Sequence, residues 1–239
     1  MDDEGFSELR GRIASAGSVC VLTGSGISAE SGLPTFRGAG SLWQSHRVED
    51  LASPEGFARD PHLLWNWYAQ RRRAHAQVEP SPAHVALAQL ERRIARFTLV
   101  TQNVDSLHRR AGSRNVLELH GALREARCTR CPARRPFDED FDLDALAHDC
   151  GGTWRPDIVW FGEPLPRDVL EAAFAAARAA DLMLVVGTSG IVQPASSLAT
   201  KRCTDAYVVE INPEATVLTP QVDRSIRARA TSVLPLLAA

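Results

Sequence analysis

The fold is decided by residues 18–29, which read Ser-Val-Cys-Val-Leu-Thr-Gly-Ser-Gly-Ile-Ser-Ala. The apolar run at 19–22 is continuous rather than alternating, which is typical of a strand buried on both faces. Gly24, Gly26 and Ala29 follow it in a G-x-G-x-x-A pattern. Glycines in that pattern let the backbone approach a pyrophosphate, and the next helix offers free N–H groups. Taken alone, the stretch fits a plain glycine turn as well as a dinucleotide-binding turn.

The segment after this turn differs from that of a hydride-transferring Rossmann domain. Gly32 and Pro34 end the helix within two turns, because proline lacks a backbone N–H and clashes with the preceding turn. Residues 33–60 are rich in Gly, Pro and Ser, so we expect a long loop with at most short helices instead of a second strand. A loop of that length in a compact domain is usually functional. A hydride-transferring oxidoreductase is therefore kept only as the alternative function that the glycine turn, taken alone, would suggest.

Segments with helical periodicity alternate with short apolar runs along the rest of the chain. Helices are expected at 6–16, 62–77, 83–95 and 168–180, with shorter ones near 104–111 and 194–199. Strands are expected at 96–101, 115–119, 153–160, 181–186 and 206–211. This alternation predicts the α/β class, with a doubly wound, parallel, Rossmann-like sheet covered by helices on both faces.

Two irregular stretches interrupt this pattern and predict a small second lobe. We assign residues 1–37, 83–126 and 153–239 to the Rossmann-like domain. Residues 38–82 form a helical insert, and residues 127–152 form a Cys-containing, zinc-ribbon-like insert with few aliphatic residues. The two inserts are expected to meet as the small lobe.

The composition excludes several classes of protein. The chain has 239 residues, of which 44% are hydrophobic and 23% charged, as in globular domains. Its net charge is −2, so we expect no global affinity for nucleic acid or anionic membranes. The acidic N-terminus is followed by no apolar region typical of a signal peptide, and no run approaches the roughly 20 apolar residues of a membrane helix. A soluble, cytoplasmic protein is expected.

Six blocks of sequence stand in order along most of the chain. They are residues 24–37 (GSGISAESGLPTFR), 101–105 (TQNVD), 119–121 (LHG), 159–163 (VWFGE), 187–189 (GTS) and 209–213 (VEINP). Together these blocks resemble the sirtuin family of NAD-dependent protein-lysine deacylases. The resemblance covers the chain from about Val19 to Pro213 and is far more specific than any single motif.

The resemblance implies that NAD is the co-substrate. The residues it places around NAD are Gly24, Ser25, Gly26, Ile27, Phe36, Arg37, Gln102, Asn103, Asp105, Gly187, Thr188, Ser189, Asn212 and Ala230. The glycine turn suits the diphosphate, and Asn103 and Asp105 are implied to hold nicotinamide and its ribose. Residues 187–189 and Asn212 are implied to bind the adenosine half.

The resemblance implies that two residues are catalytic, His120 and Asn103. The ordinary pKa of His120, near 6.5, lets it accept a proton at neutral pH. The implied role is that of general base toward the ribose hydroxyls, after the acyl oxygen has displaced nicotinamide to form an O-alkylimidate. The implied products are free lysine, nicotinamide and an O-acyl-ADP-ribose. The histidines at positions 46, 62, 75, 84 and 108 are interpreted as surface or packing residues.

Tyr68 and Arg71 stand three residues apart on the helix expected at 62–77, so they share a face. Arginine offers a fork that matches a carboxylate, and tyrosine offers a hydroxyl donor beside it. On spacing alone, the simpler interpretation is a solvated arginine face with a half-buried tyrosine. The pair lies between the glycine block and the 101–105 block, and there it resembles the Tyr-x-x-Arg pair of the sirtuin subgroup that removes negatively charged acyl groups. This resemblance implies desuccinylase and demalonylase activity alongside deacetylase activity.

Val159, Phe161, Gly162 and Glu163 resemble the substrate strand of the family, where an extended peptide adds its backbone to an edge. The implied partners are acyl-lysine proteins or peptides. We expect neither direct nucleic-acid binding nor membrane binding. The oligomeric state stays open, and a monomer is compatible with the sequence.

Three of the five cysteines lie close together, at Cys128, Cys131 and Cys150. A C-x-x-C pair followed by a second pair is a signature of tetrahedral, structural zinc. Here the second pair is incomplete, because Ala147 stands where the resemblance implies a cysteine. The fourth ligand is His148, Asp149 or a water, or else no zinc is bound.

Other activities remain open from the sequence. One is a deacetylase without preference for acidic acyl groups, and another is a protein ADP-ribosyltransferase, which shares the cleavage of nicotinamide. A module that binds NAD or ADP-ribose without turnover would not need His120, Asn103 and Asp105 together.

Overall fold

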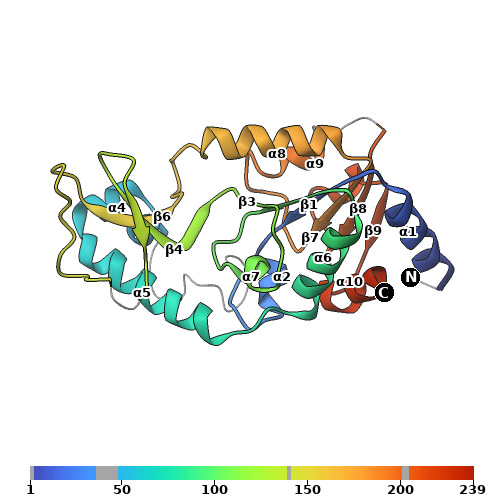
Figure 1. Ribbon diagram of the computed structural model, residues 1–239, viewed down its shortest axis with the longest axis horizontal. Helices are drawn as coiled ribbons and strands as arrows, with labels where there is room; N and C mark the ends of the chain where they lie inside the picture. The colour runs from blue at the N-terminus through green and yellow to red at the C-terminus, as the bar shows by residue number, and fades with distance from the viewer. Residues whose placement is uncertain (1–2, 36–47, 139–140, 201–204) are drawn as a thin grey trace.

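A computed structural model describes residues 3–35, 48–138, 141–200 and 205–239. Phe36 and Arg37, which the resemblance assigns to NAD, lie outside the described residues. The molecule is elongated, with a large sheet at one end and a small sheet at the other (Figure 1). Both chain termini lie at the end of the large sheet (Figure 1), where α1 (Asp3–Ser15) contacts α10 (Ala230–Ala238).

The large sheet has six parallel strands in the order β3-β2-β1-β7-β8-β9. The strands are β1 (Ser18–Thr23), β2 (Arg96–Thr101), β3 (Val116–Glu118), β7 (Leu182–Val186), β8 (Tyr207–Ile211) and β9 (Arg224–Ile226). The parallel, doubly wound sheet is therefore confirmed. The strand order reverses between β1 and β7, and open α/β sheets bind ligands beside the carboxyl ends of strands at such a point.

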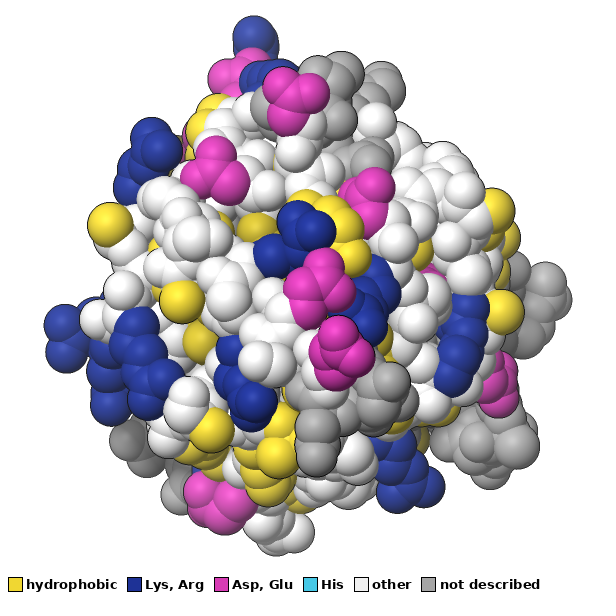
Figure 2. Space-filling view, turned by 90° about the vertical axis from the view of Figure 1, so that its right-hand side faces the viewer, with side chains coloured by type: hydrophobic (Ala, Val, Ile, Leu, Met, Phe, Trp, Pro, Cys, Tyr) yellow, Lys and Arg dark blue, Asp and Glu magenta, His cyan; other side chains and the backbone are white. Residues whose placement is uncertain are grey.

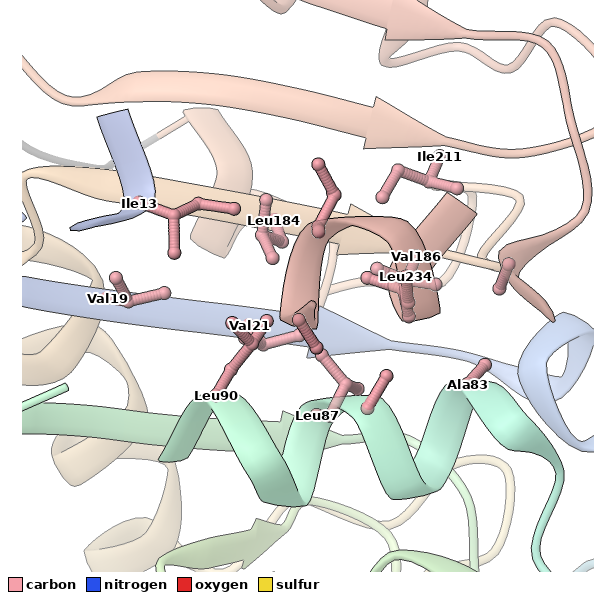
Figure 3. Close-up of a cluster of buried hydrophobic side chains, with 14 of the residues drawn as sticks. Ile13, Val19, Val21, Ala83, Leu87, Leu90, Leu184, Val186, Ile211 and Leu234 are labelled. Carbon is pink, nitrogen blue, oxygen red and sulfur yellow. The ribbon is translucent and has the colours of Figure 1, made fainter. Parts of the chain in front are cut away.

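Helices cover both faces of this sheet, and the central strands β1 and β7 are accordingly buried at every residue. Alternate residues of a strand point to opposite faces. Val19 and Val21 of β1 pack toward α1, α6 (Pro82–Arg93) and α10, in the cluster of Figure 3. Cys20 and Leu22 belong to the cluster on the other face, beneath α8 (Arg167–Ala179) and α9 (Ser197–Thr200).

The small sheet is antiparallel, in the order β5-β4-β6. Its strands are β4 (Gly121–Cys128), β5 (Arg134–Pro136) and β6 (Trp154–Ile158). It packs with α4 (Pro54–Arg59) and α5 (Pro61–Gln77), and α3 (Val48–Leu51) contacts these two helices. Trp65 of α5 lies against the rings of Phe137 and Phe141. Strand β4 crosses the domain boundary predicted at 126/127, and β6 lies beyond the one predicted at 152/153, so the small sheet includes residues assigned to both predicted domains. Those boundaries stay a prediction.

Helix α5 runs from the small sheet toward the large one (Figure 1). Asp60 caps its first turn, because the Asp60 carboxylate accepts a hydrogen bond from the N–H of Leu63, and Pro61 occupies the favoured first position. The helix buries Tyr68, Arg71 and His75 along one side. The simpler interpretation that spacing alone favoured, a solvated arginine face, therefore does not hold at Arg71.

Several elements differ from the sequence expectations. The strand expected at 153–160 ends at Ile158, and the helix expected at 194–199 spans Ser197–Thr200. The remaining short elements are α2 (Ser25–Ala29), α7 (Leu107–Arg110) and a 3-10 turn at Thr219–Gln221. Strand β9 and helix α10 have no counterpart among the expected elements. Helix α10 is apolar along most of its length, so it shows no clear polar face.

The surface agrees with the small net charge. On the face shown in Figure 2, Lys and Arg side chains are interspersed with Asp and Glu side chains rather than gathered into one patch. Among the described residues, no helix combines the length and apolar character needed to cross a membrane.

We expect Gly187→Ala to destabilise the fold by about 2 kcal/mol or more. Gly187 has a φ of +59°, and an added Cβ would lie 2.6 Å from the backbone nitrogen of Ile27. Urea denaturation monitored by circular dichroism measures the change. Gly11→Ala is the matched control. An added Cβ at Gly11, within α1, meets no atom within 4 Å, so that change should stabilise by about 0.5–1 kcal/mol. Equal free energies of unfolding for the two variants would contradict this account.

Candidate active site

The glycine turn packs directly against the end of β7. The N–H of Gly24 donates to the carbonyl of Val186 at 3.1 Å, and the N–H of Gly26 donates to the carbonyl of Gly187 at 2.8 Å. A Cβ on Gly26 would lie 2.7 Å from the Gly187 oxygen. The absence of a side chain at Gly26 is therefore required by the packing of the protein itself. The turn is held at the carboxyl edge of the sheet, beside the reversal of strand order.

Amide side chains join the ends of four neighbouring strands at this edge. The Gln102 amide after β2 donates to the Thr188 hydroxyl after β7 at 3.0 Å. The Asn212 amide after β8 donates to the Thr188 carbonyl at 3.1 Å. The Asn103 amide donates to the carbonyl of Gly24 after β1 at 3.0 Å. These hydrogen bonds hold together the strand ends whose residues the sequence resemblance assigns to NAD.

Asn103 and Asp105 meet at the hydroxyl of Ser28 on α2. Ser28 donates to the Asp105 carboxylate at 2.7 Å and accepts from the Asn103 amide at 3.1 Å. The N–H of Leu107 also donates to Asp105, at 2.9 Å. Burial raises the pKa of Asp105, and these two hydrogen bonds oppose the rise. The site thus holds a buried carboxyl group with its oxygens already oriented.

Two buried histidine rings lie beneath Ser28. The Ser81 N–H donates to Nδ1 of His84, so the neutral ring carries its hydrogen on Nε2, which lies 3.5 Å from the Ser28 hydroxyl. His108 packs 4.7 Å from His84, and its Nε2 lies 2.9 Å from the Thr23 hydroxyl. Burial lowers the pKa of His84 to about 4 and that of His108 well below its ordinary value. Both rings are neutral at physiological pH.

His120 follows β3 at the same edge of the sheet. Its Nδ1 lies 2.8 Å from the carbonyl of Gln102. Since a carbonyl only accepts, Nδ1 carries the hydrogen, and Nε2 of the neutral ring has its lone pair available. Burial lowers the pKa of His120 below its ordinary value, and the bond to Gln102 opposes this effect. His120 is therefore a neutral base with a fixed tautomer.

A small pocket lies between this edge and α5. It is lined by Ser25, Ser28, Asn103 and Asp105 from the sheet side and by Arg71 and His75 from α5. Burial lowers the pKa of Arg71 to about 10, which leaves the guanidinium charged at neutral pH. Tyr68 does not line this pocket. Its side chain is buried beside Arg71, and its hydroxyl oxygen accepts a hydrogen bond from the Trp160 indole.

The cysteine insert brings four metal-ligand groups together. One ligand atom from each of Cys128, Cys131, His148 and Cys150 lies within 4.8 Å of the others. Sγ of Cys128 and Sγ of Cys150 are 3.4 Å apart, and Nδ1 of His148 is 3.8 Å from Sγ of Cys131. A zinc ion with bonds of about 2.1–2.3 Å needs ligand atoms at such separations. Three thiolates and one imidazole therefore fit structural zinc, with His148 completing the set that Ala147 leaves open.

Comparison with known proteins identifies the family. Residues 24–194 match the Sir2 family model. The chain is 49% identical over 227 residues to NAD-dependent protein deacylase 2 of Pyrobaculum aerophilum, covering 94% of this chain and 91% of that one. It is also 49% identical over 239 residues to an NAD-dependent protein deacylase of Thermus thermophilus, covering 98% and 94%. The chain belongs to the Sir2 family.

The solved structures agree with this assignment. The complex of a Sir2 homologue with NAD superimposes with a TM-score of 0.90 at 46% identity, covering 97% of this chain and 92% of that one. The sirtuin resemblance given by the sequence blocks is thus confirmed, as is the Sir2 fold. The roles of individual residues in this sirtuin stay predictions.

The segment 159–163 of this sirtuin is an irregular turn after β6. The N–H of Val159 donates to the carbonyl of His120 at 2.9 Å, which ties this segment to the catalytic candidate. Phe161 is 54% exposed, and Gly162 has a φ of +86° with no atom within 4 Å of where a Cβ would stand. The Glu163 carboxylate is bonded to Arg155 and to the Trp160 N–H. Phe161 and Gly162 are thus the members of the segment that face open space.

Sequence reasoning misses several residues that the sirtuin fold brings to the site. Ser28 lies within the recognised glycine block, but only the folded chain shows that it joins Asn103 to Asp105. The sequence groups His84 and His75 with ordinary packing histidines. His75 follows Arg71 by four residues on the same helix face, and that spacing is the available signal. Ile27 and Ala230, both assigned to NAD, are buried, with Ala230 at the start of α10.

We expect the purified protein to contain about one zinc ion per chain, and His148→Ala to weaken zinc binding at least about tenfold. The histidine supplies the only nitrogen in the described cluster, and its loss leaves three thiolates. Competition with a chromogenic chelator measures the affinity, and elemental analysis measures the content. His62→Ala, on the exposed side of α5, is the control and should retain wild-type affinity. Wild-type protein without zinc would rule out the site, and unchanged affinity in His148→Ala would rule out the ligand.

Proposed function

We propose that this chain is an NAD-dependent protein-lysine deacylase that prefers acyl groups carrying a carboxylate. The single observation that carries the deacylase activity is the position of His120. Its basic nitrogen lies at the sheet edge where Asn103 and Asp105 are held. The names of the relatives, which are NAD-dependent protein deacylases, support this activity. The expected substrates are acylated lysine side chains of proteins or peptides.

The residues at the sheet edge fit NAD by the chemistry of their groups. Amide, hydroxyl and carboxyl groups suitable for a carboxamide and two riboses converge there, and the side-chain-free glycine turn lies next to them. When bound, NAD supplies an ADP-ribosyl group that accepts the acyl group as nicotinamide leaves. Asn103 and Asp105 would hold the nicotinamide side, and Thr188 and Asn212 the adenosine side.

The protein residues would then orient the reactants and move one proton. His120 has its hydrogen fixed on Nδ1, so Nε2 would take a proton from a ribose hydroxyl. Because the ring is buried and its pKa is lowered, it stays in the base form at neutral pH. The bond between the N–H of Val159 and the carbonyl of His120 would place a peptide bound along 159–163 next to this base.

The preference for acidic acyl groups is supported by Arg71. Its side chain is buried, remains charged, and faces the pocket shared with Asn103 and Asp105. A buried cation favours an acyl chain that ends in a carboxylate, because the two charges compensate each other's desolvation. An acetyl group lacks that charge, so it would gain nothing from Arg71.

We expect His120→Ala to lower kcat for deacylation by at least about 100-fold. The wild-type profile of kcat/KM against pH should fall on the acid side with a midpoint below about 6.5, because burial lowers the pKa of the base. Mass spectrometry of peptide and nucleotide products measures turnover. O-acyl-ADP-ribose identifies deacylation, whereas ADP-ribose attached to protein would identify ADP-ribosyl transfer instead. An active His120→Ala variant would overturn the proposed role.

We expect Arg71→Met to lower kcat/KM for a succinyl-lysine peptide by about 10–100-fold relative to the matched acetyl-lysine peptide. Methionine keeps much of the side-chain length but removes the charge and the donors. Arg73→Met is the matched control, because Arg73 lies on the exposed side of the same helix. An unchanged ratio in Arg71→Met would refute the acidic-acyl preference while leaving the deacylase activity intact.

A further inference from the structure

Trp160 connects the small sheet to helix α5 through one buried hydrogen bond. The indole N–H of Trp160 donates to the hydroxyl oxygen of Tyr68 at 3.0 Å. Both side chains are buried, with exposures of 2% and 4%. Trp160 lies two residues after β6, and Tyr68 lies three residues before Arg71 on α5. The bond therefore links the segment tied to His120 with the helix that carries Arg71.

The position of Trp160 is fixed from three sides. The guanidinium of Arg155 stacks on its ring at 3.4 Å, and Phe57 packs on it at 5.3 Å. The N–H of Trp160 donates to the Glu163 carboxylate at 2.8 Å. Arg155 donates to both oxygens of the same carboxylate, at 2.5 and 2.9 Å. Arg155 and Glu163 thus form a neutral, two-bonded pair that holds the indole in place.

The indole bond fixes the direction of the Tyr68 hydroxyl hydrogen. A phenol O–H prefers the plane of its ring, so its hydrogen has two favoured positions. With the N–H of Trp160 pointing at the oxygen on one side, the hydroxyl hydrogen must take the other. Within the described part of the chain, no group accepts that hydrogen. Burial raises the pKa of Tyr68 to about 12, so the hydroxyl keeps its proton.

We propose that Trp160, held by the Arg155–Glu163 pair, is a positioning residue that aims the Tyr68 hydroxyl as a second hydrogen-bond donor, beside Arg71, to the carboxylate of the acyl group. The inference rests on the proposed acidic-acyl preference and adds the residues that orient one of its hydrogen-bond donors. Because Glu163 balances the charge of Arg155, this pair orients the Tyr68 hydroxyl without adding net charge. The inference also gives Glu163 a positioning role in place of the contact with substrate that the sequence suggested.

The test uses Trp160→Phe in the full-length protein. Phenylalanine keeps an aromatic ring for Arg155 and Phe57 and removes the indole N–H. The ratio of kcat/KM for succinyl-lysine to that for acetyl-lysine should fall roughly five- to tenfold, mainly through the KM of the succinyl peptide. Trp65→Phe is the matched control. Trp65 also donates a buried indole hydrogen bond, but to the carbonyl of Trp154 at 3.0 Å rather than to the Tyr68 hydroxyl.

A double-mutant cycle separates positioning from general destabilisation. If Trp160 acts through the Tyr68 hydroxyl, Trp160→Phe should lower the ratio in wild-type protein and leave it unchanged in a Tyr68→Phe background. An equal loss in both backgrounds, or an equal loss in Trp65→Phe, would overturn the inference.

The ratio of kcat/KM for succinyl-lysine to that for acetyl-lysine in the wild-type protein shows whether the positioning role alone or the proposed acidic-acyl preference has failed. A wild-type protein that shows no preference for the succinyl peptide overturns the acidic-acyl preference, and this assignment with it. A wild-type preference that Trp160→Phe retains overturns the positioning role alone.

Discussion

The contact between the glycine turn and the end of β7 is the constraint on which the rest of the site depends. The backbones of Gly26 and Gly187 lie so close that neither position has room for a Cβ. This approach places the turn over the reversal of strand order, where the ends of β1, β2 and β7 meet. The amide of Asn103 can then reach the carbonyl of Gly24. A wider gap would separate the two halves of the co-substrate site.

Buried polar groups at this edge are joined to one another, which is the condition for burying them at acceptable cost. Ser28 joins Asn103 to Asp105, and a neutral His84 lies beneath it. Because the two buried histidines are uncharged, they add no positive charge beneath Ser28 and Asp105. The charge of Arg71 lies instead on the opposite wall of the pocket, on α5.

Helix α5 couples the two sheets. Its Trp65 packs in the core of the small sheet, while Arg71 and His75 face the pocket beside the large sheet. The small sheet therefore sets where these two side chains lie, and the metal-ligand cluster lies in an insert with few aliphatic residues, which a bound zinc ion would stabilise. The hydrogen bond from Trp160 to Tyr68 is a second link between β6 and α5.

The sequence by itself determined the family and the class of fold, because ordered motifs and apolar periodicity are local properties of the chain. The parallel sheet, the glycine turn and the cluster of Cys128, Cys131 and Cys150 could all be predicted in this way. The side chain of Arg71 could not be placed from its spacing, which favoured an exposed helix face. Only the tertiary structure buried it, since burial depends on what packs against a helix. Likewise, only the folded chain brought Ser28 to Asp105 and Trp160 to Tyr68, pairs separated by 77 and 92 positions. The first contact follows from the pairing of β1 with β2 and the second from the packing of α5 against the small sheet, and no local sequence pattern specifies either.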